Sequence, residues 1–343
     1  MTPPMQSSDP RPVDPQAESA EEVIYQSLRS QSWSEFCGQE TVKTSLQLAI
    51  RAAKERSEVL DHVLFYGPPG LGKTTLAHLL AKEMGVNIRV TSGPALERSG
   101  DIAAILTNLQ EGDVLFIDEI HWLNRVVEET IYPAMEDYRI DVILGKGPAA
   151  RTLRLDVPRF TLVGATTQAG KLSSPLRDRF GLIHKMEFYT DAELATIIAT
   201  AAEKLQLTIA SDAAAHLASR SRKTARVALK LLKRVRDFAQ VQGKTAVGKQ
   251  HVDGALKLLE VDALGLDAAD RKLLLTIIDK FAGGPVGLKT LSAATAEDIE
   301  TIEDVYEPFL IRAGLLKRTT RGRVVTPLAC QHVERDIPKG LEF

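Results

Sequence analysis

Short apolar runs that end in glycine, acidic or threonine residues recur along the first half of the chain. The run at residues 62–66 ends at a glycine, that at 114–117 at an Asp-Glu pair, and that at 160–163 at a Gly-Ala-Thr-Thr segment. After the first run, leucines recur at helical spacing up to Met84, and Gly85 follows as a stop signal. Continuous apolar runs of this length are typical of buried parallel strands. Strands that alternate with helices predict an α/β domain with a mostly parallel sheet.

A different pattern interrupts this domain between the second and third runs. Ile140, Val142 and Leu144 alternate with polar residues, and Leu153 and Leu155 alternate again after a Gly-Lys-Gly-Pro turn at 145–148. Alternation on both sides of a turn predicts a β-hairpin inserted in the α/β domain. Its apolar face is expected either to pack on its own domain or to meet a partner.

The second half of the chain is predicted to be mainly helical. Helical patterns at 191–205, 211–220, 224–240 and 249–260 indicate a small helical domain. Further helices at 267–281 and 297–313 precede two short β-type segments around a Thr-Thr-Arg-Gly turn, which indicates a winged helix. We therefore expect a disordered tail at 1–20, an α/β domain at 21–188, a small helical domain at 189–261 and a winged helix at 262–343.

Composition adds limits to this picture. Five prolines among the first twenty residues favour a disordered tail. The formal net charge is −2, so any binding of nucleic acid must use a local basic patch. The two cysteines, Cys37 and Cys330, give neither a disulfide framework nor a zinc site. Because we find no apolar run long enough to span a bilayer and no signal-peptide pattern, we expect a cytoplasmic protein without a membrane anchor.

The strongest chemical signal is Gly67-Pro-Pro-Gly-Leu-Gly-Lys73-Thr74, which fits the phosphate-binding loop pattern. Its glycines let backbone N–H groups surround phosphate oxygens, and the helix that follows points its positive end at the same anion. Lys73 is expected to reach the terminal phosphates, and the Thr74 hydroxyl is expected to bind Mg²⁺. The motif lies between a predicted strand and a predicted helix, as its function requires.

Acidic and hydroxyl groups end the next two predicted strands. Asp118 suits a metal ligand and Glu119 suits activation of the attacking water, although a solvated pair of turn carboxylates is the alternative. Thr167 is placed to sense the γ-phosphate or the water, and an ordinary hydroxyl at a strand end is the alternative. Arg177 and Arg179 lie in a following loop and are either an exposed salt-bridged pair or the source of an arginine finger for a neighbouring site.

Taken together, the segments GPPGLGKTT, LFIDEI, GATT and SPLRDRF resemble the AAA+ ATPases. The segments YPAMEDY and FAGGPVGL are more specific and resemble the RuvB family, over roughly residues 21 to 330. This resemblance implies an ATP- and Mg²⁺-dependent motor that drives branch migration of Holliday junctions in recombination and repair. It implies a homohexameric ring, RuvA bound to the hairpin around residues 138–157, Holliday junction DNA as substrate, and RuvC as a further partner to test.

The resemblance also assigns roles to individual residues. It places Lys73, Asp118, Glu119, Thr167 and Arg179 in catalysis, with Arg179 as the finger and Thr167 as the first sensor. It places Thr74 and Asp118 at the metal and Arg318 and Arg323 at the DNA. Positions that match nucleotide contacts are Leu28, Arg29, Gly70, Gly72, Lys73, Thr74, Thr75, Glu136, Asp137, Tyr138, Tyr189 and the second sensor Arg226.

Several positions depart from the family's usual residues, and the core catalytic groups are not among them. They are Ser30, Trp122, Gln168, Lys223, Ala225 and Ile299. At three of them, Trp122, Gln168 and Ile299, the family commonly has arginine, which puts the grip on DNA and the signalling of nucleotide state in question.

Two other functions compete with the motor. A clamp-loader-like or protein-remodelling AAA+ switch would share the first two domains but lack the hairpin and the winged helix. A nucleotide-binding scaffold would not need Lys73, Glu119 and Arg179 together. The basic segment 312–323 contains no acidic residue and by itself fits a DNA-contacting wing and a protein-contacting wing equally well. Beside the motifs of a motor ATPase, we interpret it as a wing that contacts the DNA backbone.

Overall fold

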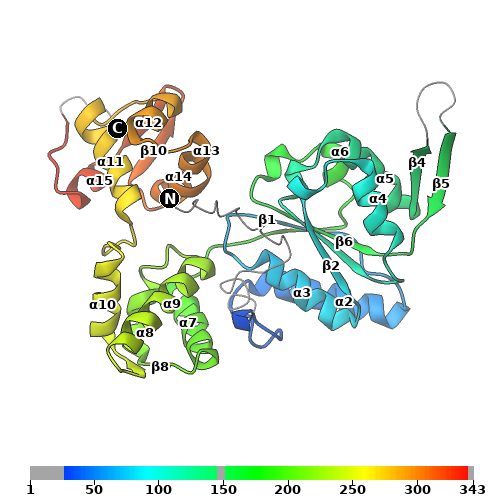
Figure 1. Ribbon diagram of the computed structural model, residues 1–343, viewed down its shortest axis with the longest axis horizontal. Coiled ribbons are helices and arrows are strands. Elements are labelled where there is room, and N and C mark those ends of the chain that lie inside the picture. Colours follow the sequence, from blue (N-terminus) through cyan, green and yellow to red (C-terminus); the bar gives the residue numbers. More distant parts are fainter. Residues whose placement is uncertain (1–26, 145–150, 339–343) are drawn as a thin grey trace, which may run out of the picture.

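The computed structural model describes residues 27–144 and 151–338. The expected tail at 1–20 and the hairpin turn at 145–148 lie outside the described residues. Three bodies follow one another along the chain: a large α/β domain, a small helical lid and a C-terminal head (Figure 1). Among the described residues, no helix is both long and apolar enough to cross a bilayer.

The large domain is built on a five-stranded parallel sheet of order β2-β3-β6-β1-β7. The predicted α/β fold with a parallel sheet is therefore confirmed. The strands are β1 (Val63–Tyr66), β2 (Ile88–Ser92), β3 (Val114–Asp118), β6 (Thr161–Thr166) and β7 (Leu182–Lys185). The helices around them are α2 (Glu40–Arg56), α3 (Lys73–Met84), α4 (Ser99–Thr107), α5 (Arg125–Asp137) and α6 (Ser174–Arg177).

The central strands are apolar throughout because both faces of the sheet are covered. Val63 and Phe65 of β1 belong to one hydrophobic cluster, which includes α2 and α3, whereas Leu64 belongs to a second, which includes α4 and α5. In β3, Phe116 and Ile117 divide between the same two clusters. Successive side chains of a strand point to opposite faces of the sheet. An unbroken apolar run therefore packs against the helices on both faces.

The two edge strands were not predicted from the sequence. Every residue of β2 and β7 is partly buried or exposed, and the two strands contain Arg89, His184 and Lys185. An edge strand pairs on one side only and is covered less completely, so its sequence lacks the apolar run that marks a central strand.

The inserted hairpin is confirmed as the antiparallel pair β4 (Arg139–Leu144) and β5 (Arg151–Asp156). Ile140 lies opposite Leu155 and is fully buried in the domain core. Leu153 lies farther out and is 45% exposed. The apolar face is thus divided: its base packs on the large domain, and Leu153 faces solvent beyond it.

The lid contains the four helices that the sequence predicted. They are α7 (Asp191–Lys204), α8 (Ser211–Ala218), α9 (Ala225–Val241) and α10 (Lys249–Leu258), with short strands β8 (Thr208–Ile209) and β9 (Ala246–Val247). Helix α7 begins in a capping box, in which Thr190 accepts a hydrogen bond from the Glu193 backbone N–H and the Glu193 carboxylate accepts one from that of Thr190. The lid core is continuous with one face of the large domain, through residues that include Leu194 and Tyr189.

The head has its own hydrophobic cluster and a two-stranded wing. Its elements are α11 (Ala268–Phe281), α12 (Leu288–Thr295), α13 (Ile299–Thr301), a π-helix (Ile302–Tyr306), α14 (Glu307–Arg312), β10 (Leu316–Thr319), β11 (Gly322–Val325) and α15 (Pro327–His332). The sequence predicted α11, the wing and a continuous helix at 297–313. It missed α12 and the π-helix, in which backbone hydrogen bonds span five residues along the chain and not the four of an α-helix.

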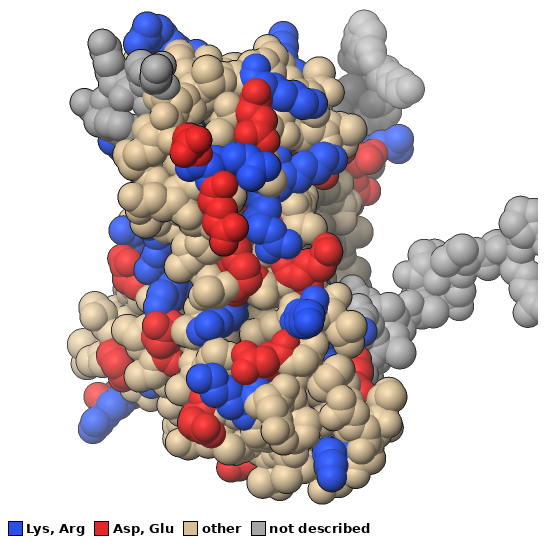
Figure 2. All heavy atoms as spheres, turned by 90° about the vertical axis from the view of Figure 1, so that its left-hand side faces the viewer, with Lys and Arg blue, Asp and Glu red and all other residues tan. Residues whose placement is uncertain are grey.

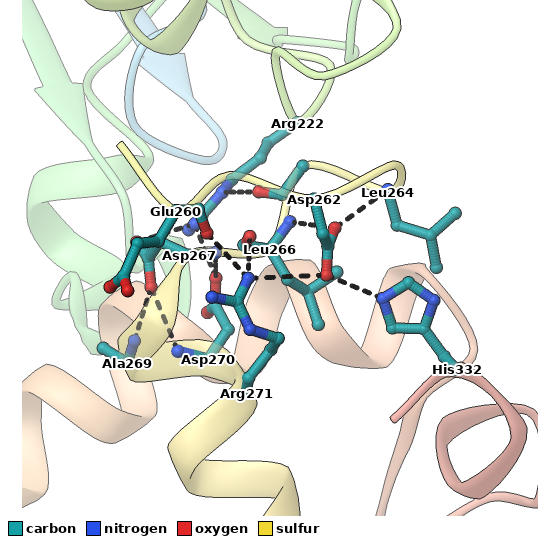
Figure 3. A network of polar contacts seen from close by, with 11 residues as sticks. Arg222, Glu260, Asp262, Leu264, Leu266, Asp267, Ala269, Asp270, Arg271 and His332 are labelled. Carbon is teal, nitrogen blue, oxygen red and sulfur yellow. Dashed lines mark hydrogen bonds and ion pairs between the residues drawn. The ribbon is translucent and has the colours of Figure 1, made fainter. Parts of the chain in front are cut away.

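Polar groups join the lid to the head (Figure 3). Arg222, in the lid loop before α9, donates to the Gly265 carbonyl and to the carboxylates of Asp267 and Asp270. Burial raises the pKa of Asp270 to about 7, against the opposing effect of the Arg222 charge. Nearby, His332 is bonded to Asp262. The two small domains are therefore linked by buried, charge-assisted contacts as well as by the chain.

Candidate nucleotide and DNA sites

The phosphate-binding loop follows β1 and turns through left-handed backbone conformations. Gly70 and Gly72 have φ of 78° and 95°. A Cβ at Gly70 would lie 2.7 Å from Cβ of Arg226, and one at Gly72 would lie 3.0 Å from the Phe36 ring. Two constraints therefore require glycine at these positions: the left-handed backbone conformation and the close approach of neighbouring side chains. The loop leads directly into the N-terminus of α3, which favours an anion at that point.

Lys73 lies inside this loop and not on the surface. Its Nζ donates to the carbonyls of Gly67 (2.7 Å) and Pro68 (3.0 Å), and only 7% of the residue is exposed. Burial lowers the pKa of Lys73 to about 8, although the carboxylates of Glu119 and Asp118 oppose the shift. Nearby negative charge therefore does not fully compensate for the burial of this ammonium group, and a bound polyphosphate would stabilise it.

Two carboxylates end β3 beside the loop. Burial raises the pKa of Asp118, and its Oδ1 accepts a hydrogen bond from the Glu119 backbone N–H at 3.0 Å. Oε2 of Glu119 accepts hydrogen bonds from both the backbone N–H and the hydroxyl of Thr167, each at 3.0 Å. The predicted acid pair and the predicted sensor are therefore brought together. This happens because β3 and β6 are neighbouring parallel strands with their carboxyl ends at one edge.

The groups present fit Mg²⁺ bound largely through a nucleotide. Thr74 supplies a hydroxyl at the start of α3, and Asp118 supplies a carboxylate at the adjoining strand end. Mg²⁺ is commonly held by one or two carboxylates together with substrate phosphates. No cluster of three or more His, Cys, Asp or Glu side chains suited to a metal is found in the described part of the chain.

Other predicted nucleotide contacts surround the loop from three segments. Leu28 is buried in the core, and Arg29 is bonded to His78 of α3 at 3.2 Å. The Tyr189 hydroxyl donates to the Leu71 carbonyl at 3.0 Å. The backbone N–H of Arg226 donates to the Gly70 carbonyl at 3.3 Å, which brings the lid directly onto the loop. Thr75 lies in the first turn of α3.

The remaining predicted residues form a second group near the amino-terminal ends of the strands, opposite the carboxyl ends that hold the phosphate-binding loop. Arg179 pairs with Glu136 at 3.0 Å, donates to the Pro175 carbonyl and lies 4.5 Å from the Tyr132 ring centre. Tyr138 packs edge-on against Phe160, just before β6 begins.

Two contacts fix the position of this group. Ring Nε2 of His62, just before β1, is bonded to the Met135 carbonyl of α5, and Asp137 follows at the end of that helix. A Cβ at Gly181 would lie 3.0 Å from Cβ of Asp61. These segments adjoin the strand starts, whereas the phosphate-binding loop follows a strand end. Arg179, Glu136, Asp137 and Tyr138 therefore do not share the nucleotide site of their own chain.

The wing places its two predicted DNA-contacting arginines differently. Arg318 on β10 has a side chain 57% exposed and pairs with Glu303 at 2.7 Å. The Arg323 side chain is only 9% exposed and is bound by both oxygens of the buried Glu307. The expectation of two equivalent phosphate contacts is not met in this arrangement, because one guanidinium is enclosed.

The segment 312–323 has no acidic residue of its own, but helix residues that precede it supply carboxylates. Arg312 is also engaged, 3.6 Å from the Phe188 ring centre. On the face formed by the head and the lid, the coloured basic and acidic residues are interspersed and make no continuous basic patch (Figure 2). A count along the sequence could not detect this neutralisation across elements.

The departures from the family pattern lie at identifiable places. Trp122 is 51% exposed beside the acid pair, with Lys171 over its ring. Gln168 donates to Asp304 of the head, and Lys223 pairs with Asp191. Ile299 is partly exposed at the start of α13. For Ser30 and Ala225 the structure offers no special role.

Comparison with known proteins gives a consistent result over the three bodies. Models of the Holliday junction DNA helicase RuvB P-loop domain, the RuvB AAA lid domain and the RuvB C-terminal winged helix domain match residues 28–186, 189–262 and 263–334. The chain is 51% identical to the Thermotoga maritima RuvB Holliday junction branch migration motor, covering 91% of this chain and 100% of that one, with a TM-score of 0.83. A mutant of Thermotoga maritima RuvB matches at 51% identity, with 91% and 99% coverage and a TM-score of 0.84.

The buried ammonium group of Lys73 leads to a prediction about protons. Bound phosphates favour its charged form, so nucleotide binding raises its pKa above the value near 8. At pH 8.5 binding should take up roughly 0.7 proton per site, and ATP affinity should decline as the pH rises above 8. Isothermal titration calorimetry in buffers of different ionisation enthalpy measures this uptake. At pH 7, where Lys73 is already charged, the uptake should nearly vanish; equal uptake at both pH values would contradict the assignment.

Proposed function

Because the chain belongs to the RuvB family of Holliday junction branch migration motors, we propose that it is an ATP-hydrolysing DNA motor subunit. It acts as a homohexameric ring with RuvA on Holliday junctions in recombination and repair. ATP and Mg²⁺ bind at the phosphate-binding loop. The chain carries the hairpin and the winged helix that a clamp-loader-like switch would lack, and the intact Lys73, Glu119 and Arg179 argue against a scaffold without activity.

The observation that carries this proposal is the separation of one catalytic apparatus into two halves. Lys73, Asp118 and Glu119 lie at the carboxyl edge of the sheet, and Arg179 lies at the opposite edge with Glu136. An arginine that stabilises charge in phosphoryl transfer must reach the γ-phosphate. Within one chain Arg179 does not. A head-to-tail ring brings the finger of one subunit to the nucleotide of the next, since such contacts close into rings.

Each residue then has a task that its environment explains. Lys73 binds the terminal phosphates, and its burial strengthens that attraction. Thr74 and Asp118 would hold Mg²⁺, which would supply positive charge to the phosphates. Glu119 orients and deprotonates the attacking water, and Thr167 sets the direction of that carboxylate through its two hydrogen bonds. Arg226 brings the lid to the loop, so closure of the site moves the lid and the head attached to it.

Mixed rings test the finger. Lys73→Ala and Arg179→Ala subunits should each be nearly inactive alone, since each lacks a different half of the composite site. In random 1:1 rings roughly a quarter of the interfaces regain both halves, so ATPase activity should partly return. Coupled ATPase assays over a series of mixing ratios measure the effect. With mixed rings verified by mass spectrometry, no rescue at any ratio would count against a finger in trans.

The wing arginines should behave differently from each other. Arg318→Ala should weaken binding to all DNA sequences and lower the slope of log affinity against log salt by roughly 0.9. Arg323→Ala leaves Glu307 buried without its cation and should destabilise the head by about 3–5 kcal/mol. Thermal unfolding and salt-dependent fluorescence anisotropy distinguish the two effects.

A compensated variant completes this test. Arg323→Met with Glu307→Leu removes both members of the buried pair and should recover much of the stability. Normal DNA affinity in the compensated protein would assign Arg323 to structure. Lost affinity in a stable head would restore Arg323 as a DNA contact.

The outer part of the hairpin is proposed to bind RuvA. Leu153→Asp should abolish RuvA-dependent stimulation of the ATPase and spare the basal rate, because the side chain is exposed and the base of the hairpin is anchored separately by Ile140. Val90→Asp, an exposed apolar position on β2, serves as the matched control. Equal loss of stimulation and basal activity in the Leu153 variant would indicate a structural role for the hairpin.

A further inference from the structure

A polar contact joins the head to the sensor loop of the large domain. Gln168 follows Thr167 directly, at the end of β6. Its Nε2 donates to Oδ2 of Asp304 in the π-helix at 3.0 Å. Arg312 lies over the Phe188 ring as a second contact between the same two domains. The DNA-binding body of the chain therefore touches the segment that holds the sensor.

From Gln168, hydrogen bonds and close polar contacts lead to the catalytic carboxylate. The Gln168 backbone N–H donates to Oγ1 of Thr166 at 3.0 Å, and that hydroxyl is bonded to His121 Nδ1 at 2.9 Å. His121 Nδ1 lies 3.2 Å from Oε2 of Glu119. Thr166 is fully buried and the His121 side chain is 2% exposed, so neither can move independently of its neighbours.

The carboxylate at the end of this series is held toward β6. Glu119 has a left-handed backbone with φ of 46°. Its Oε2 accepts both hydrogen bonds from Thr167 and faces His121. The lone pairs of Oε2 are thus committed to the sensor, and a water at the phosphate must use Oε1 or displace one of these hydrogen bonds. This arrangement therefore restrains the proposed base.

On the other side of the contact, the π-helix also holds the wing. Glu303, the neighbour of Asp304, pairs with Arg318 on β10 at 2.7 Å. A DNA phosphate that binds Arg318 competes with Glu303 for the same guanidinium. Since Glu303 and Asp304 are consecutive, a shift of one carries the other with it. Widened turns of this kind are frequent at functional sites.

We propose that Gln168 and His121 are positioning residues for Glu119, and that the head, through Asp304, holds them in a low-activity arrangement until the wing binds a DNA phosphate. This inference rests on the proposed function and names the regulation of the same site. Position 168, where the resembled family commonly has arginine, then couples DNA binding at the wing to the activity of Glu119 in ATP hydrolysis.

The contact can be removed without unfolding the protein. Gln168 and Asp304 meet at the surface, where one hydrogen bond contributes little to stability. Gln168→Ala and Asp304→Ala in the full chain should each raise the ATPase rate without DNA by roughly 2- to 10-fold, which corresponds to the loss of one hydrogen bond. The rate at saturating junction DNA should not change, so the stimulation ratio falls by the same factor.

The double variant and a matched control sharpen the comparison. Gln168→Ala with Asp304→Ala should equal either single variant, because both remove the same contact. Glu300→Ala removes one exposed carboxylate just before the π-helix and should behave as wild type. A DNA-free rate that is unchanged or lower in both single variants would overturn the proposal. Wild-type junction migration, measured separately, decides whether the proposed function itself stands.

A reversible cross-link provides an independent readout. Cysteines at 168 and 304, in a Cys37→Ala background, can be joined by a short bifunctional thiol-reactive linker with a reducible disulfide, which spans the length of the original side chains and should lock the head on the sensor loop. The cross-linked protein should hydrolyse ATP at the low basal rate even with junction DNA, and reductive release of the linker should restore the high rate. Single-cysteine proteins treated with the same reagent control for the modification. Full stimulation in the verified cross-linked protein would overturn the proposal.

Discussion

The parallel direction of the central sheet is the constraint on which the rest of this structure depends. Because the strands run the same way, the phosphate-binding loop, the Asp118-Glu119 pair and Thr167 all follow strand ends and meet at one edge. The same geometry places the segments that precede the strands at the amino-terminal ends of the sheet, where Arg179 pairs with Glu136. The proposed ring depends on this arrangement, because Arg179 lies away from the phosphate-binding loop of its own chain.

Desolvation gives the nucleotide site its electrostatic character. Lys73 is buried among backbone carbonyls. Burial lowers the pKa of Lys73 and raises the pKa of Asp118, and both shifts favour the uncharged form of the side chain. The charged forms of both groups are therefore stabilised when an ion of opposite charge binds. In the proposed function, that ion would be the polyphosphate for Lys73 and Mg²⁺ for Asp118. The site thus keeps unsatisfied charge for its ligands and does not neutralise it within the protein.

Buried charge is treated differently in the two small domains. Between lid and head, the Arg222 guanidinium is shared among Asp267, Asp270 and a carbonyl, so its positive charge is paired within the protein. In the wing, Glu307 encloses Arg323 while Glu303 holds Arg318 near solvent. Buried ion pairs favour rigid transmission of movement, and the exposed pair can be exchanged for a phosphate.

The sequence by itself determined the α/β class, the phosphate-binding loop, the acid pair, the hairpin and the helices of the lid, because these features depend on local periodicity and on fixed spacing. It did not predict β2 and β7, whose edge positions remove the apolar signal, or the π-helix at 302–306. Only the tertiary structure decided that Arg179 and Glu136 lie away from the loop of their own chain, since that depends on which ends of parallel strands adjoin. Only the tertiary structure placed Glu307 against Arg323 and Asp304 against Gln168, because such pairs join residues far apart in sequence through packing that no local pattern encodes.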